Sequence, residues 1–479
     1  MLFNSYQFAI FFPIVFALYW LLPHRFRWVL LLAASYYFYM SWKAEYVFLI
    51  LLTTAVSYFA GILIEKSDKK SSKKLILVVS LVICLGVLFV FKYFNFFFEQ
   101  VTKLFSKFAI QLSPVTLKLL LPVGISFYTF QTVAYVIDVY RGTVPAEKNF
   151  GIYATFVSFF PQLVAGPIER TANLLPQIKA EHRFDYNQAA YGMKLMAWGF
   201  FKKMVVADNL AVMIDSIYAN MYSYSGFVLF ITVFLFSIQI YCDFGGYSDI
   251  ARGASKLMGI ELMENFKSPF FSTSVNQMWG RWHISLTSWL RDYVYFPLGG
   301  SRCSRPRKYF NIMVTNLVSG LWHGADWTFV AWGGINGLGQ LFDDVFHIKP
   351  CKERGTVKWW IRAAIIFAFC TTTGVFFRAQ TCHDAVYVLT HVFTGIFHPL
   401  TYFPKGWAEF GLNDISTLLK VAVYVLPLAF YDYFSLDYDV IDVISHKKAW
   451  LRYSVYVLLV LVILLMHSTD GVSFVYFQF

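Results

Sequence analysis

The stretch LILVVSLVICLGVLFVFKYFNFFF, residues Leu75–Phe98, decides the class of fold, because its 24 residues hold a single charge, at Lys92. About 20 consecutive apolar residues are enough for a helix to cross the hydrocarbon core of a bilayer. The whole chain of 479 residues has the same character, with 58% hydrophobic residues, 14% charged residues and a mean hydropathy of +0.54. Soluble domains average about 25% charged residues, so this composition excludes a soluble protein. We predict an all-α, polytopic membrane protein in a lipid bilayer.

Apolar runs of spanning or nearly spanning length recur along the whole chain. Together with shorter, interrupted runs in its middle, they predict roughly 11–12 transmembrane helices. Irregular backbone at membrane depth must be buried in protein or line a cavity, so the interrupted runs predict short re-entrant and interfacial amphipathic helices. The longer runs are Gln7–Leu22, Trp28–Met40, Tyr46–Ile64, Leu117–Val139, Gly226–Cys242, Trp359–Phe376, Leu418–Tyr431 and Tyr453–His467.

The net charge of +12 is concentrated in basic loops. Glu65–Lys74 carries five lysines, and Arg281–Lys308 carries five arginines and Lys308. Basic loops stay on the cytoplasmic side, which places the N-terminus outside after three spans are counted back from Glu65. No nucleic-acid-binding motif accompanies these charges, so we predict no nucleic-acid partner.

Several common chemistries have no support in the sequence. The six cysteines show no CxxC pair and no metal-ligand spacing, so we predict no metal site. The chain contains neither a G-x-S-x-G elbow nor a P-loop, which leaves no local support for a serine nucleophile or for nucleotide hydrolysis. We also predict no tightly bound cofactor.

Polar chemistry concentrates between Asn265 and Phe342. Helical spacing in WGRWHISL puts Trp279, Trp282 and His283 on one face, which predicts an amphipathic helix near the cytoplasmic surface. His283 then faces the protein or the bilayer interior. The tryptophans have an ordinary alternative role, because tryptophan is common at headgroup level.

The stretch NLVSGLWHGADW, from Asn316, carries the strongest catalytic candidate, His323. A helix that begins near Lys308 would place this histidine 15 residues in, roughly 20 Å along the helix and inside the hydrocarbon core. An ionisable residue at that depth is costly and indicates function, and imidazole can take a proton near neutral pH. Gly320 and Gly324 should leave room for a substrate beside it. The alternative is a hydrogen-bonded packing histidine.

Two further features have a functional and an ordinary interpretation. Asp243 lies in YCDFGGYSD, where Gly245 and Gly246 should break the span, either to line a cavity or as a plain helix end. The run of basic residues after Gly300 is either a topology signal or a binding site for an anionic acyl donor such as a coenzyme A ester. Its members are Arg302, Arg305, Arg307 and Lys308.

Five stretches, in this order, resemble the membrane-bound O-acyltransferase (MBOAT) family and its bacterial alginate O-acetylase-like branch. Five such motifs in one order are highly specific, although each alone could arise by chance. They are LPVGISFYTFQTVAYVIDVYRG from Leu121, FFPQLVAGPIERTANLLPQI from Phe159, IQIYCDFGGYSDIARG from Ile238, NFKSPFFSTSVNQMWGRWHISLTSWLRDYVYFPLGGSR from Asn265 and LVSGLWHGADWTFVAWG from Leu317.

The resemblance implies catalysis by His323, with His283 as the second, assisting histidine. It implies a ring of tilted helices around a central funnel, with residues 1–120 as N-terminal transmembrane helices, 121–345 as the catalytic core and 346–479 as C-terminal transmembrane helices of one unit. The expected substrate tunnel contains Trp279, Trp282, Trp322, Asp243 and Asp326.

The activity implied is transfer of an acetyl group from a cytoplasmic thioester, acetyl-CoA, across a bacterial inner membrane. The acceptor would be a hydroxyl of an extracytoplasmic polysaccharide or of a partner acetyltransferase. His323 would act as general base or through an acyl-histidine. The alternatives are D-alanyl transfer to teichoic acid from a carrier-protein thioester, and a transporter or scaffold without chemistry of its own.

Overall fold

The computed structural model describes residues 1–110, 115–468 and 474. Within these residues every regular element is a helix, and no strand occurs. The prediction of an all-α fold is therefore confirmed.

Six helices in the described residues are long and apolar enough to cross a membrane. The protein is thus a multi-pass membrane protein, as predicted. The expected total of roughly 11–12 spans stays a prediction, because other helices, such as α1 (Tyr6–Leu21) with 16 residues, are shorter. The six spans are Ala44–Lys66, Lys70–Ser106, Phe227–Leu257, Val357–Arg378, Ile415–Phe434 and Ala449–Met466.

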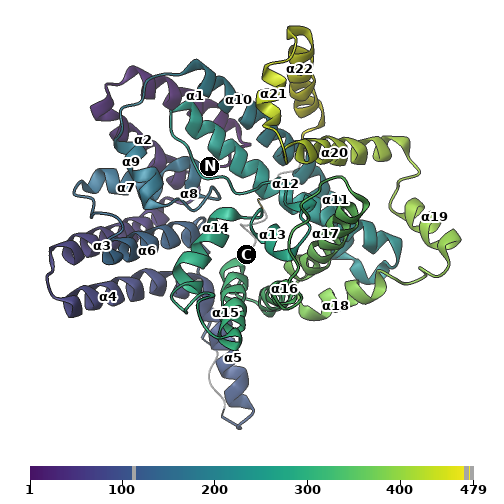
Figure 1. Ribbon diagram of the computed structural model, residues 1–479, viewed down its shortest axis with the longest axis horizontal. Helices are drawn as coiled ribbons and strands as arrows, with labels where there is room; N and C mark the ends of the chain where they lie inside the picture. Colours follow the sequence, from purple (N-terminus) through teal and green to yellow (C-terminus); the bar gives the residue numbers. More distant parts are fainter. Residues whose placement is uncertain (111–114, 469–473, 475–479) are drawn as a thin grey trace. The chain divides into compact units, whose positions relative to one another are not determined.

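The chain divides into two compact units, of which the first comprises Met1–Met196 and Ile250–Met263. The expected division at residues 120 and 345, and the ring around a funnel, stay predictions. The helices of the first unit, drawn from purple to blue in Figure 1, are α1, α2 (His24–Met40), η1 (Ala44–Tyr46), α3 (Val47–Lys66), α4 (Lys70–Leu88), η2 (Phe89–Tyr93), α5 (Phe94–Ser106), α6 (Ile125–Arg141), α7 (Phe150–Ser158), α8 (Phe160–Leu163), α9 (Thr171–Lys179) and most of α10 (Tyr186–Phe200).

The second unit comprises Ala197–Asp249 and Glu264–Phe479. It contains most of α12 (Phe227–Leu257), whose last turns belong to the first unit. Its other helices are η3 (Phe201–Ala207), α11 (Asp208–Ala219), η4 (Met221–Ser223), η5 (Pro269–Phe271), α13 (Val275–Trp279), α14 (Ile284–Leu290), η6 (Arg291–Tyr295), α15 (Arg305–His323), α16 (Trp327–Val345), α17 (Val357–Arg378), α18 (Cys382–His391), α19 (Pro399–Glu409), α20 (Ile415–Phe434), α21 (Val440–Ser445) and α22 (Ala449–Met466).

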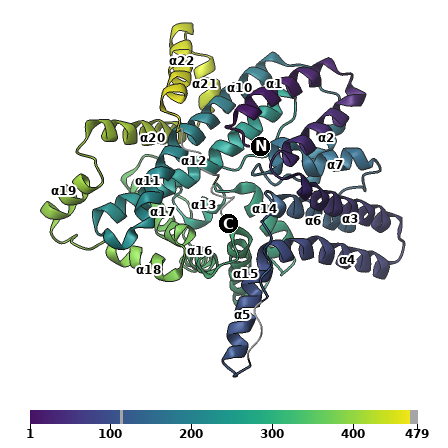
Figure 2. The same ribbon diagram turned by 180° about the vertical axis from the view of Figure 1, so that it is seen from behind.

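Small residues and buried hydroxyl groups hold the first unit together. Helices α3 and α6 lie side by side in both views (Figures 1 and 2), and a Cβ added at Gly61 of α3 would lie 2.6 Å from the hydroxyl oxygen of Tyr135. The Tyr153 hydroxyl donates a hydrogen bond to Ser57 Oγ at 2.7 Å. Polar groups in a membrane must find such internal partners, because lipid offers none.

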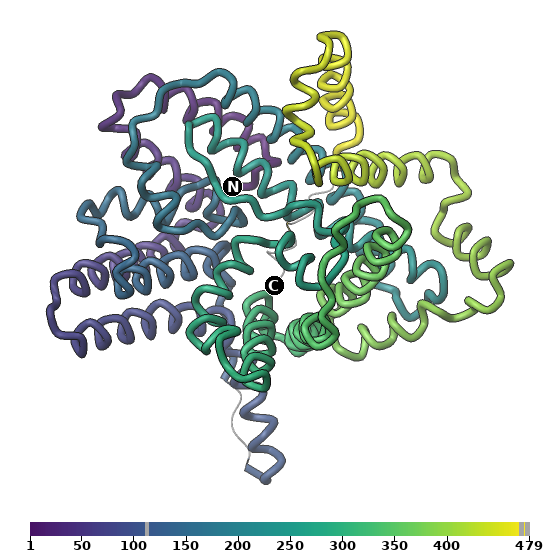
Figure 3. Tube along the Cα trace, viewed as in Figure 1, coloured from purple at the N-terminus to yellow at the C-terminus, as the bar shows by residue number. Residues whose placement is uncertain are grey.

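Helices α15 and α16 form the close antiparallel pair that carries the candidate site in the second unit, and Figure 3 follows the chain from one into the other. A Cβ at Gly320 would lie 2.2 Å from the carbonyl oxygen of Phe329, and one at Gly333 would lie 2.4 Å from that of Asn316. Glycine is therefore required at both positions for the two backbones to approach so closely.

Adjacent glycines of α16 give a matched test of this packing. Gly333→Ala should destabilise the protein by about 1–3 kcal/mol, because the new methyl group meets backbone. Gly334→Ala should be neutral or stabilising by up to about 1 kcal/mol, because its nearest neighbour would be Leu317 Cδ2 at 3.8 Å. Thermal unfolding of the two purified variants measures the difference; equal stability would refute the close packing.

Candidate active site

His323 is the last residue of α15, which begins at Arg305. Pro306 lies in the first turn, where its missing N–H leaves no hydrogen bond unmade and favours a helix start. The helix thus begins three residues earlier than the sequence predicted. At 1.5 Å per residue, the helix places His323 roughly 27 Å from its first residue, Arg305. The sequence predicted a helix start near Lys308 and therefore a shorter distance of roughly 20 Å from the first residue.

The His323 side chain is buried among aromatic rings, with 3% of the residue exposed. Its ring centroid lies 4.9 Å from that of Trp322, 5.0 Å from that of Trp332 and 5.1 Å from that of Phe377, each at a steep interplanar angle. Edge-to-face contacts of this kind are favourable, so the rings restrict the orientation of the imidazole.

The two glycines near His323 do not leave room for a substrate, so that prediction is wrong. A Cβ at Gly324 would lie 2.1 Å from the Phe329 ring, and the space beside Gly320 is taken by the Phe329 backbone. The glycines instead allow α16 and Phe329 to close over the end of α15.

The segment around His283 is not one amphipathic helix, so that prediction is also wrong. Helix α13 is followed by Gly280, and α14 begins at Ile284. Between them His283 has φ +43°, in the left-handed region. A non-glycine residue there costs about 1–3 kcal/mol and persists only where its surroundings enforce it, often at functional sites.

Asn265 enforces this turn. Its Oδ1 accepts hydrogen bonds from Ser285 Oγ at 2.7 Å and from the Ser285 backbone N–H at 3.3 Å. Its Nδ2 donates to Ser248 Oγ at 3.1 Å, and its backbone carbonyl accepts from the Ile284 N–H at 3.0 Å. The asparagine of NFKSPF and the histidine of RWHISL therefore belong to one structural element.

The His283 ring is fully buried. Its centroid lies 4.6 Å from that of Phe244 and 6.3 Å from that of His323. Burial lowers the pKa of His283 to about 3, because a low-dielectric surrounding disfavours the charged form. A ring that stays neutral is suited to orienting its neighbours and is a poor acceptor for a catalytic proton.

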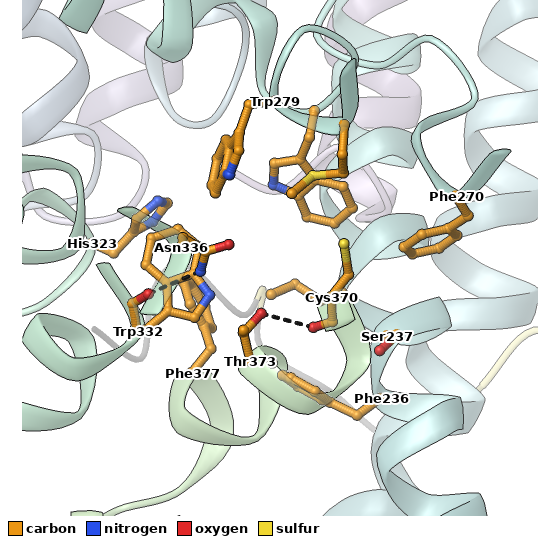
Figure 4. A pocket seen from close by; sticks show the side chains of 14 residues that line it. Phe236, Ser237, Phe270, Trp279, His323, Trp332, Asn336, Cys370, Thr373 and Phe377 are labelled. Carbon is orange, nitrogen blue, oxygen red and sulfur yellow. Dashed lines mark hydrogen bonds between the residues drawn. The ribbon is translucent and has the colours of Figure 1, made fainter. Parts of the chain in front are cut away.

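A cavity of about 60 Å³ opens beside His323 in the second unit (Figure 4). This volume exceeds the roughly 10–15 Å³ that one water needs and is smaller than the roughly 150 Å³ that holds benzene, so it fits a small acyl group. Two expected tunnel residues, Trp279 and Trp282, line it with His323. The other lining residues are Phe236, Ser237, Ile240, Phe270, Met278, Trp332, Asn336, Cys370, Thr373, Gly374 and Phe377.

Two other expected tunnel residues do not line this cavity. Trp322 is buried, and its ring packs against those of both His283 and His323. Asp326 is the N-cap of α16, where its carboxylate accepts a hydrogen bond from the Thr328 backbone N–H at 2.8 Å. Trp322 therefore supports the two histidines, and Asp326 caps α16.

Asp243 also lies away from the cavity, inside α12. That helix runs unbroken from Phe227 to Leu257, so the predicted break at the glycine pair is wrong. A Cβ at Gly246 would lie 2.7 Å from the carbonyl oxygen of Gly199. The glycine pair therefore permits close packing between α12 and the end of α10, which continues into the π-helical segment η3.

Segment η3 carries two buried lysines that the sequence patterns did not reveal. Lys203 Nζ lies 2.6 Å from Asp243 Oδ1 and 2.7 Å from Asp208 Oδ1. Lys202 Nζ lies 2.5 Å from Asp249 Oδ2. Buried charges of this kind must be paired, so this cluster explains why Asp243 is tolerated inside an apolar helix.

The sequence also did not predict several residues that line the cavity. Asn336 of α16 stands one helical turn after Trp332, on a helix that also carries Gln340, Asp343 and Asp344, so its amide did not stand out in the sequence. Cys370 and Thr373 come from α17, and no sequence pattern brings that helix beside His323.

The basic run lies at the opposite end of α15 from His323. Arg302, Arg305 and Arg307 are exposed. Lys308 forms an ion pair with Asp344 of α16. All three arginines are therefore accessible to an anionic ligand, while the Arg307 guanidinium also donates to the carbonyl oxygen of Leu298 at 3.3 Å.

Comparison with known proteins decides the family. The family model "MBOAT, membrane-bound O-acyltransferase family" matches residues 147–379, which include both histidines and every residue lining the cavity. A probable alginate O-acetylase AlgI of Azotobacter vinelandii is 36% identical over 428 residues, which cover 89% of this chain and 84% of that protein. The chain belongs to the membrane-bound O-acyltransferase family. This MBOAT protein is therefore an O-acyltransferase.

Two further relatives of this MBOAT protein differ in what they modify. A peptidoglycan O-acetyltransferase of Helicobacter pylori is 32% identical over 428 residues, 83% of this chain and 80% of that protein. A teichoic acid D-alanyltransferase of Streptococcus thermophilus is 30% identical over 240 residues, 47% of this chain and 57% of that protein. The similarity to the O-acetylating relatives extends over much more of the chain.

Proposed function

We propose that this MBOAT protein transfers an acetyl group from cytoplasmic acetyl-CoA to a hydroxyl group outside a bacterial inner membrane, with His323 as general base. The observation that carries the proposal is the position of this buried imidazole on the wall of a small, mainly apolar cavity. Imidazole accepts a proton near neutral pH, and aromatic walls keep bulk water from the thioester.

In the proposed reaction the acceptor hydroxyl loses its proton to His323 as its oxygen attacks the thioester carbonyl carbon. A C–O bond forms, the C–S bond breaks, and the thiolate of coenzyme A leaves and takes up the proton. A covalent acyl-histidine is the alternative route. The neutral ring of His283 and the ring of Trp322 hold the His323 imidazole in place, and Trp279 and Trp282 confine the acetyl group.

The exposed arginines at the start of α15 are proposed to bind the anionic end of the donor. Replacing Arg305 and Arg307 together with glutamine should raise KM for acetyl-CoA roughly tenfold, which corresponds to about 1.4 kcal/mol of lost binding. The maximal rate should change much less, because these residues lie far from His323. Initial rates at varied acetyl-CoA concentrations give KM and the maximal rate separately. An unchanged KM would leave the arginines as topology signals only.

The acceptor is proposed to be an exported glycan, or an extracytoplasmic acetyltransferase that passes the acetyl group on. The relatives' names refer to alginate and to peptidoglycan in their own bacteria. We place the N-terminus outside and the basic loops in the cytoplasm. Ester-linked acetate, measured on secreted and wall polymers of cells with and without this protein, tests the proposal. Equal acetate on every polymer would contradict it.

D-alanyl transfer is the competing function within the family. A D-alanyl group carries an ammonium, which is costly to bury without an acidic partner. The cavity wall, as far as the described residues form it, contains no carboxylate. This observation favours a neutral acyl group; a copurifying carrier protein loaded with D-alanine would reverse the choice.

A further inference from the structure

The side chain of Asn336 is held in one orientation at the cavity wall. The residue is 1% exposed, and its Nδ2 donates a hydrogen bond to the carbonyl oxygen of Trp332 at 2.9 Å. A peptide carbonyl can only accept, so the amide nitrogen must face Trp332 and the amide oxygen must face the other way. Figure 4 shows this oxygen pointing into the cavity that His323 also lines.

The amide oxygen of Asn336 accepts no hydrogen bond from the residues that the structure describes. The two hydroxyl groups of the cavity wall already have partners: Thr373 donates to the carbonyl oxygen of Cys370 at 3.0 Å, and Ser237 donates to Thr371 Oγ1 at 3.2 Å. The Asn336 oxygen faces the cavity, where a bound ligand with an N–H or O–H group would supply a donor.

We propose that Asn336 is a positioning residue that accepts a hydrogen bond from an N–H or O–H group of a substrate bound in the cavity. This inference rests on the proposed function. Acetyl-CoA carries such a group, the amide N–H of its arm nearest the sulfur, and the acceptor carries one in its hydroxyl.

A fixed acceptor would set the substrate's depth, which non-directional burial against apolar walls does not. Most of the lining is aromatic or aliphatic and holds a ligand by non-directional burial. Asn336 and Trp332 stand one turn apart on α16, and the Trp332 ring contacts His323 at 5.0 Å between centroids. A substrate that is hydrogen-bonded to Asn336 is therefore positioned by the same helical turn that orients the imidazole.

The test uses Asn336→Leu, which keeps the approximate shape of the side chain and removes its polar atoms. In the purified full-length protein, KM for the substrate that supplies the hydrogen should rise roughly tenfold, with a much smaller change in kcat. Thr315→Val is the matched control, because it removes a hydroxyl from α15 whose hydrogen bond goes to the carbonyl oxygen of Asn311 in the same helix, outside the cavity. Both KM values of this control should stay within about twofold of the unmodified protein.

Two thioester donors identify the source of the hydrogen. The probes are acetyl-CoA and an analogue in which an ester oxygen replaces the amide N–H nearest the sulfur. If Asn336 accepts its hydrogen bond from the thioester donor, kcat/KM of the unmodified protein should be roughly tenfold lower with the analogue than with acetyl-CoA. The Asn336→Leu protein should then have the same kcat/KM for both donors. If Asn336 accepts its hydrogen bond from the acceptor hydroxyl, Asn336→Leu should raise KM for the acceptor. The ratio of kcat/KM for the two thioester donors should then be the same in both proteins.

Unchanged KM values for both substrates would overturn the proposal, as would a loss in kcat alone that is equal for both donors, since that pattern indicates a purely structural role. If Asn336→Leu does not fold, Asn336→Ala replaces it in the same assays. Failure of the proposed function is distinguishable, because the unmodified protein would then transfer acetyl from neither donor.

Discussion

Replacing His323 with alanine is expected to abolish acetyl transfer while the protein still accumulates in the membrane. A positioned general base contributes about 10²–10⁴-fold to a rate, and alanine leaves no group in the cavity that takes the hydroxyl proton in its place. The side chain is packed among rings, so the amount of folded protein must be measured as well. The measurement is ester-linked acetate on the exported polymers, normalised to protein in the membrane fraction.

His398→Ala is the control, because His398 is an exposed histidine at the N-cap of α19 and its side chain makes no capping hydrogen bond. It should acetylate at the unmodified rate. His323→Gln, which keeps more of the side-chain volume, should be as inactive as the alanine variant. Normal acetylation by either His323 variant would end the assignment of the general base.

Lys203→Met is expected to produce the largest loss of stability. Its ammonium lies between Asp208 and Asp243, with side-chain exposures of 5%, 6% and 2% for the three residues. Removing one member of a buried ionic cluster takes away part of the charge compensation of the others, at a cost of about 3–5 kcal/mol. Thermal unfolding of the purified protein should therefore shift to a markedly lower temperature.

Lys405→Met provides the comparison for an exposed ion pair. Lys405 Nζ lies 3.7 Å from Glu409 Oε1, and its side chain is 70% exposed, so its loss should cost no more than about 1 kcal/mol. Adding Asp243→Asn to Lys203→Met should recover part of the lost stability, because the two residues interact. A Lys203→Met protein that unfolds at the unmodified temperature would show that the cluster is not a stabilising element.

The class of fold follows from composition, because apolar content and the length of apolar runs directly determine whether a helix can cross a bilayer. The candidate histidines were found for a different reason: an ionisable residue in an apolar segment stands out locally. Lys202 and Lys203 were not recognised as buried residues, because two adjacent lysines resemble a topology signal, and Asp243 and Asp249 lie 40 and 47 positions further along the chain from Lys203 and Lys202, respectively; only Asp208 is local.

Errors arose where tertiary packing overrides local pattern. The glycine pair after Asp243 looks like a helix break, yet α12 continues because the glycines admit a neighbouring helix. The spacing around His283 fits a helix, yet Asn265 holds the residue in a left-handed turn. Asn336 became visible as a site residue only when its neighbours across the cavity were known.

Sealed membrane vesicles that contain the full-length protein test most directly whether one site serves both compartments. Radiolabelled acetyl-CoA is supplied at the face that carries the basic loops, and a hydroxyl-bearing glycan, with any partner acetyltransferase it requires, is supplied at the opposite face. The account predicts ester-linked label on the glycan without leakage of coenzyme A across the membrane. Label that appears only when donor and acceptor share one face would contradict it.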